Sequence, residues 1–173
     1  MTNTGHIYKR WCLIQIRAWL PACLWCVFIF WGSTDDGGGQ ATSLRLMTFL
    51  HINFPALSWE QLAKLIFYLR KACHVTEYAI LAGLVMRGFL CSSIIKKQES
   101  WSFPLAILTF SLCVGYAASD EYHQSLTQER CGCVTDVMID AVGVFLGLQT
   151  MWCLIYFKTA KLDSTALKIP EKD

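Results

Sequence analysis

The chain has 173 residues, of which 54% are hydrophobic and 16% are charged, and its mean hydropathy is +0.39. A soluble domain usually carries about 25% charged residues, so this composition is typical of a protein that folds in lipid. The formal net charge of +2 gives no support for a nucleic-acid-binding surface, and no nucleic-acid partner is predicted.

The first apolar segment covers about residues 18–31 and reaches the length of a membrane span only if it extends back to Trp11. A secretory signal peptide is the rival interpretation, because three basic residues precede the segment: Lys9, Arg10 and Arg17. However, the region before Gly32 has no pair of small residues at the spacing of a cleavage site. We therefore expect a retained helix, preceded by a cytoplasmic tail of residues 1–17.

The long connection over residues 33–71 follows, and it begins with a Gly-rich loop. Ser58 and Gln61 have the spacing of a capping box, which predicts the start of a helix. Apolar residues continue at helical spacing: Leu62, Leu65, Ile66 and Leu69. This helix is expected to lie at the membrane interface or to lead directly into the second span. The pattern over residues 37–59 leads to no prediction.

Three further apolar segments are each long enough to cross a bilayer: about 72–95, 101–119 and 134–157. A basic cytoplasmic tail is expected after them, at residues 158–173. The predicted fold class is an all-α membrane protein. It has about four transmembrane helices in a bundle and an interfacial helix in the long outer loop.

The distribution of Lys and Arg predicts the orientation, because basic residues gather on the cytoplasmic side. Four spans would place ten basic residues on one side: Lys9, Arg10, Arg17, Arg87, Lys96, Lys97, Lys158, Lys161, Lys168 and Lys172. Five would lie on the other: Arg45, Lys64, Arg70, Lys71 and Arg130. We therefore expect a multi-pass protein of the plasma membrane with both termini in the cytoplasm.

The nine cysteines lead to no prediction of a metal site or of a cofactor. Cys23 and Cys26 form a C-x-x-C pair, but they lie in an apolar segment and no second pair follows at zinc spacing. In such surroundings a thiol behaves as a small apolar side chain.

Ionisable residues are concentrated at the predicted outer ends of the last three spans. Lys71, His74 and Glu77 lie at the entry of the second span, on one side of a helix. Four polar residues lie at the exit of the third span: Asp120, Glu121, His123 and Gln124. Arg130 follows in the short outer loop.

The fourth span carries two acids and two glycines on one face: Asp136, Asp140, Gly143 and Gly147. The G-x-x-x-G spacing lets another helix approach closely, so this face is expected to point into the bundle. A carboxylate within a span costs several kcal/mol unless it is paired or hydrated. Lys71, His74 and Arg130 are the expected partners.

These residues together resemble the signature of the VanZ-like membrane proteins, over most of residues 18–157. The matching positions are Ser33, Lys71, His74, Tyr78, Leu81, Asp120, Glu121, Gln124, Arg130, Asp136, Gly143 and Gly147. The chain departs from the family pattern at Asp140, where Asn is usual, and at Gln128–Glu129, where Pro-Gly is usual. Residues 37–59 have no counterpart in the pattern.

The resemblance implies a helical bundle in the membrane and a cell-envelope role linked to susceptibility to the glycopeptide teicoplanin. It does not imply a reaction. Three interpretations of the charged residues stay open: a structural network that joins helices, a membrane-embedded hydrolase or transferase acting on an envelope lipid, and an outward-facing binding site. Besides membrane lipids, the partners expected of a binding site are a lipid headgroup, a cell-wall precursor or a glycopeptide.

Overall fold

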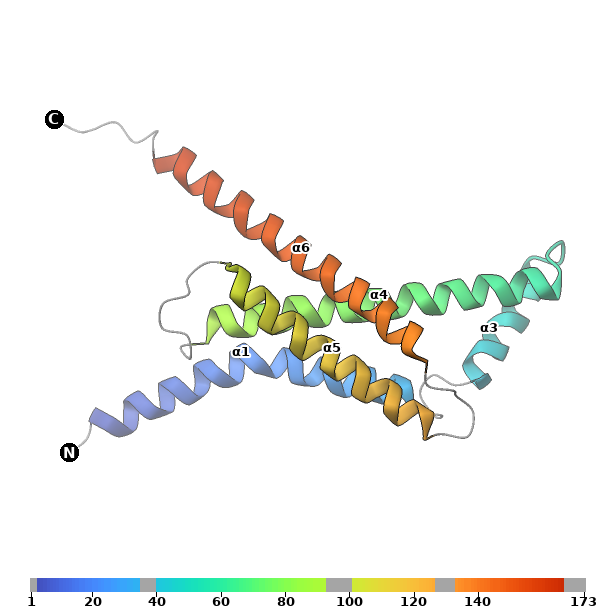
Figure 1. Ribbon diagram of the computed structural model, residues 1–173, viewed down its shortest axis with the longest axis horizontal. Helices are drawn as coiled ribbons and strands as arrows, with labels where there is room; N and C mark the ends of the chain where they lie inside the picture. Colours follow the sequence, from blue (N-terminus) through green and yellow to red (C-terminus); the bar gives the residue numbers. More distant parts are fainter. Residues whose placement is uncertain (1–2, 35–39, 93–100, 127–132, 167–173) are drawn as a thin grey trace.

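The computed structural model describes residues 3–34, 40–92, 101–126 and 133–166, and these residues are almost entirely helical. The helices are α1 (Asn3–Ser33), α3 (Gln40–Asn53), α4 (Trp59–Cys91), α5 (Phe103–Ser125) and α6 (Val134–Ala166). The prediction of an all-α chain is confirmed. Figure 1 shows four long helices in one bundle and the shorter α3 beside the start of α4.

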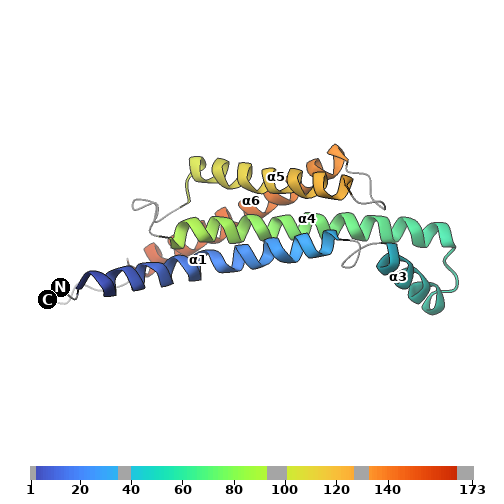
Figure 2. The ribbon, with the colours of Figure 1, turned by 90° about the horizontal axis from the view of Figure 1, so that it is seen from below.

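The helix α4 is the centre of the bundle, because α1, α3, α5 and α6 all pack against it. Both described ends of the chain lie at one end of the bundle, and the end of α5 and the start of α6 lie toward the opposite end (Figures 1 and 2). The helices α1 and α5 therefore run in one direction, and α4 and α6 run in the other.

The start of α4 follows from the predicted capping box. The Gln61 backbone N–H donates to Ser58 Oγ over 3.3 Å, and the Ser58 backbone N–H donates to Gln61 Oε1 over 2.9 Å. These bonds satisfy two of the donors that every helix start leaves free. The helix then continues unbroken to Cys91, so the predicted start leads directly into the second apolar segment.

Within the described residues, three helical segments are long and apolar enough to cross a membrane: Trp11–Ser33, Phe103–Ser125 and Val134–Lys161. The third apolar segment thus continues to Ser125, beyond its predicted end at residue 119. The second predicted segment, 72–95, is helical to Cys91 but is not one of the three, and its last residues lie outside the described part.

Small and large apolar side chains are distributed between the core and the surface as expected for a protein in lipid. Several buried positions between the helices hold alanine: Ala18, Ala22, Ala82, Ala106 and Ala117. Many large apolar side chains point outward, such as Leu24, Val27, Ile107, Val142 and Leu154. Helices pack in membranes through small residues, because lipid solvates the large ones as well as a protein core does.

Candidate functional site

The helix α6 packs closely against α4. A Cβ atom added to Gly143 would collide with the backbone of Val75, and one added to Gly147 would collide with the backbone of Ala79. The G-x-x-x-G face of α6 therefore points into the bundle, as predicted. The pairing rises in the same direction along both helices, so α4 and α6 are parallel, and the first turns of α6 lie beside the middle of α4, where Asp136 pairs with Lys71.

That end of the bundle holds the predicted polar residues, which we call the polar cluster. Its described members are Ser33, Lys71, His74, Glu77, Asp120, Glu121, Gln124, Asp136 and Asp140. They come from the last turn of α1, the middle of α4, the last two turns of α5 and the first turns of α6. Arg130 belongs to the same prediction but lies outside the described residues.

One part of the polar cluster joins α1 to α5. Ser33 Oγ donates to Asp120 Oδ2 over 2.8 Å. Gln124 Nε2 donates to the same oxygen over 2.9 Å and to Ser33 Oγ over 3.2 Å. All three residues are more than 90% buried. This closed triangle of hydrogen bonds satisfies one oxygen of a buried carboxylate and fixes the ends of both helices.

A second part joins α4 to α6. Lys71 Nζ forms an ion pair with Asp136 Oδ1, and both side chains keep partial exposure at the mouth of the bundle. One turn further in, His74 Nδ1 lies 3.7 Å from Asp140 Oδ1 and 3.9 Å from Glu77 Oε2. Lys71 and His74 are therefore the neighbours of the two acids, as the sequence predicted.

Glu121 forms a link between α5 and the start of α6. Its Oε2 atom accepts a hydrogen bond of 2.9 Å from the backbone N–H of Cys133, just before α6 begins. The carboxylate thus receives one of the first donors of the helix. His123, by contrast, lies beside the ring of Phe30 with 4.8 Å between ring centroids, and it does not join the polar cluster.

Three buried groups of the polar cluster, and the hydroxyl of Tyr78 beside it, lack hydrogen-bond partners among the described residues. They are Asp120 Oδ1, Asp140 Oδ1, His74 Nδ1 and the Tyr78 hydroxyl. Tyr78 is fully buried and lies close enough to Asp120 and Asp140 for electrostatic interaction. A buried oxygen without a donor is costly, so this part of the bundle is suited to a bound group that donates hydrogen bonds.

A cavity of about 310 Å³ adjoins the polar cluster between α1, α3 and α4. Ser33, His74, Glu77 and Arg70 are among its polar lining residues. Phe28 and other apolar residues of the same helices form the rest of its wall. Arg70 is held across the cavity, because its guanidinium group donates to Ser43 Oγ of α3 over 3.2 Å. The sequence did not reveal this cavity, since α3 was not predicted.

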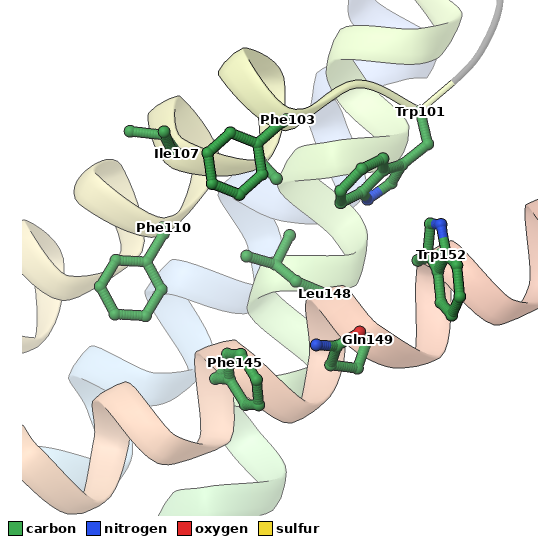
Figure 3. A pocket seen from close by; sticks show the side chains of 9 residues that line it. Trp101, Phe103, Ile107, Phe110, Phe145, Leu148, Gln149 and Trp152 are labelled. Carbon is green, nitrogen blue, oxygen red and sulfur yellow. The ribbon is translucent and has the colours of Figure 1, made fainter.

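A second cavity lies between α5 and α6 at the opposite end of the bundle, and its volume is about 470 Å³. Aromatic rings dominate its wall, including Trp101, Phe110, Phe145 and Trp152 (Figure 3). No charged side chain lines it among the described residues. Its chemistry therefore differs from that of the polar cluster.

No group of three or more His, Cys, Asp or Glu side chains is arranged to hold a metal ion in the part of the chain that the structure describes. Cys23 is exposed on α1 and Cys26 is partly buried, and both thiols are free. The hydroxyl of Tyr116 donates to the backbone carbonyl of Cys26 over 2.7 Å, which fastens α5 to α1.

A sequence model of the VanZ/LLP1 family matches residues 18–157. These are also the residues over which the sequence resembles that family. Comparison with curated proteins and with solved structures found no match. The family match covers most of the chain, and three of its helices are apolar enough to cross a bilayer. The chain is therefore a helical membrane protein that belongs to the VanZ/LLP1 family.

Proposed function

We propose that the chain crosses the plasma membrane four times, with α4 as the additional span and both termini in the cytoplasm. The common position of the two described chain ends supports an even number of crossings (Figure 1). Four described basic residues near that end support its cytoplasmic location: Arg17, Arg87, Lys158 and Lys161. The polar cluster then faces outward.

The charges of α4 are compatible with a span because Arg87 and Lys71 have partners on other helices. Arg87 donates to the backbone carbonyls of Arg17 and Ala18, although the distances of 3.5 and 3.3 Å are long. Lys71 is paired with Asp136. With 33 residues, α4 is about 50 Å long, against about 30 Å of bilayer hydrocarbon. Its first turns and α3 therefore extend beyond the bilayer as the interfacial part of the outer loop.

The polar cluster and its adjoining cavity form, in this proposal, a site for an envelope component. The protein has a cell-envelope role linked to teicoplanin susceptibility, and the site recognises the polar head of a lipid or of a cell-wall precursor. One observation carries the proposal: buried oxygens of Asp120, Asp140 and Tyr78 lack donors next to a cavity with polar and apolar walls. A network with a structural role alone would be expected to satisfy its own groups.

The structural interpretation has its own support in the triangle of Ser33, Asp120 and Gln124 and in the ion pair of Lys71 with Asp136. The two roles are compatible, because a binding site needs fixed walls. They differ in what they predict for Asp140, whose Oδ1 atom has no described hydrogen-bond partner. A purely structural role makes Asp140→Asn nearly neutral, whereas a binding role makes it harmful at unchanged stability.

The test is the teicoplanin susceptibility of a sensitive bacterium that expresses the chain. We expect Arg130→Ala, Asp136→Ala and Asp140→Asn each to abolish the shift in inhibitory concentration that the parent chain produces. Lys96→Ala and Glu60→Gln are the controls, and Glu60 is an exposed acid of α4 paired with Lys64. Equal effects of all five substitutions at matched expression would reject the site.

A further inference from the structure

The acids of the polar cluster outnumber its described cations. Its described acids are Glu77, Asp120, Glu121, Asp136 and Asp140, which come from three helices. The cluster contains one described lysine, Lys71, and this residue forms an ion pair with Asp136. Neighbouring carboxylates repel one another more strongly in a bundle surrounded by lipid than in water, because the dielectric constant is lower there. The cluster is therefore suited to a positively charged partner.

The hydrogen bonds lead to the same conclusion from a different observation. The unpartnered atoms Asp120 Oδ1 and Asp140 Oδ1 are acceptors, and both residues are about 3% exposed. The hydroxyl oxygen of Tyr78 is also without a partner and can accept as well as donate. A phosphate or a carboxylate would bring more acceptors, whereas a primary ammonium group brings three donors and a charge of the required sign.

The cavity between α1, α3 and α4 borders these groups through two of its lining residues, because Ser33 donates to Asp120 and His74 lies 3.7 Å from Asp140. Glu77 lines it with a carboxylate that is 30% exposed, and Glu77 interacts electrostatically with Asp120. Arg70 also lines it but lies seven residues earlier on α4, about 10 Å along the axis. A cation at Glu77 would lie about two helical turns from Arg70, whose guanidinium group is held by Ser43 of α3. The apolar wall includes Phe28 and Leu46.

We propose that this cavity binds an amphiphile whose head carries a protonated primary amine. The ammonium group lies at Glu77, on the side of the cavity where Ser33 and His74 border Asp120 and Asp140. The apolar chain lies against Phe28 and Leu46. This inference rests on the proposed function, because it specifies the ligand class of the same site. An amine-bearing lipid and an amine-bearing cell-wall precursor share this chemistry.

The experiment uses the purified full chain in dodecyl maltoside and three four-carbon probes that differ in their head group: n-butylammonium, n-butanol and butyrate. Binding is measured by titration calorimetry and by the rise in the unfolding midpoint that a ligand of the native state produces. We expect butylammonium to bind at least about tenfold more tightly than butyrate, because charge-assisted hydrogen bonds are the stronger ones.

The variants are Glu77→Gln and Asp140→Asn, with Glu60→Gln as the matched control at an exposed acid of the same helix. Both site variants should weaken butylammonium binding about tenfold, and the control should leave it unchanged. If Glu77→Gln fails to fold, Asp140→Asn alone decides the question. Displacement of butylammonium by phosphatidylethanolamine vesicles, compared with phosphatidylcholine vesicles, would identify a lipid as the source. Displacement by a soluble lysine peptide would identify a cell-wall amine.

Two results would overturn the inference in distinguishable ways. In the first, butanol or butyrate binds as tightly as butylammonium, and substitutions in the cavity abolish this binding. That result would reject an amine as the ligand and leave the proposed site intact. Absence of binding by all three probes, together with unchanged teicoplanin susceptibility in Asp136→Ala and Asp140→Asn, would reject both proposals.

Discussion

Gly143 of α6 lies directly against the backbone of Val75 of α4, with no space for a side chain between the two helices. One turn later Gly147 makes the same contact with Ala79. These two contacts bring the helices close enough for Asp136 and Asp140 to reach Lys71 and His74. The packing of small residues is therefore what assembles the charged half of the site.

Substitution of these glycines should destabilise the protein. In Gly147→Ala the new Cβ atom would meet the backbone of Ala79, and overpacking of this kind costs about 1–3 kcal/mol. Gly115→Ala in α5 is the matched control, because no atom lies within 4 Å of the added Cβ. The control should be neutral or stabilising by up to about 1 kcal/mol, since alanine favours helix. Denaturant unfolding in detergent measures both, and equal effects would contradict the close contact.

The ion pair of Lys71 with Asp136 should stabilise the folded protein because the two charges interact with each other, and neither charge should stabilise it alone. Lys71→Ala and Asp136→Ala should each cost about 1–3 kcal/mol, below the value for a fully buried pair, because both groups are partly exposed. The double variant should cost less than the sum of the two. A double-mutant cycle of unfolding free energies measures the coupling. Strict additivity would show that the two side chains do not interact.

The triangle at the end of α1 gives a third prediction. Ser33→Ala removes a donor from a buried oxygen of Asp120 and should cost about 1–3 kcal/mol. Ser119→Ala is the control on α5, because its hydroxyl is exposed and bonds only its own helix, at the Tyr116 carbonyl, among the described contacts. That variant should change the unfolding free energy by less than about 0.5 kcal/mol. A thermal unfolding series in one detergent compares the two.

The proposed orientation predicts which positions are accessible from outside an intact cell. In a cysteine-free background, Ser125→Cys at the end of α5 should react with a membrane-impermeant thiol reagent. Lys158→Cys near the end of α6 should react only after the membrane is permeabilised. Both positions are exposed in the structure, so a lack of labelling reports sidedness and not burial. The reverse pattern would place the polar cluster in the cytoplasm and remove the reason for an envelope ligand.

The sequence predicted the face of α6 well, because four residues at helical spacing combine two acids with two glycines, and no lipid-facing stripe has that composition. It also predicted the start of α4 from its capping box. It did not predict α3, whose exposed residues include Leu44 and Phe49 as well as polar ones. The helix α3 packs on the first turns of α4, and that long-range contact is not visible in local sequence patterns.

The character of α4 shows why hydropathy gives an incomplete account of this chain. Because of its charged residues, α4 is not among the described helices whose composition is apolar enough to span a membrane. Hydropathy treats each helix as if lipid surrounded it, whereas four neighbours surround α4. The apolar stripe predicted on its first turns is correspondingly divided: Leu62 and Ile66 are buried, while Leu65 and Leu69 remain exposed.

The central place of α4 has a consequence for the order in which the protein is made. Synthesis proceeds from the N-terminus, so α4 leaves the ribosome before α6 exists. Until α6 arrives, Lys71 and His74 lack the carboxylates of Asp136 and Asp140, and the backbone around Val75 lacks its cover. The later helix therefore completes the burial of an earlier one, and a nascent chain that stops after α5 leaves Lys71 without its acidic partner Asp136 for membrane quality control to recognise.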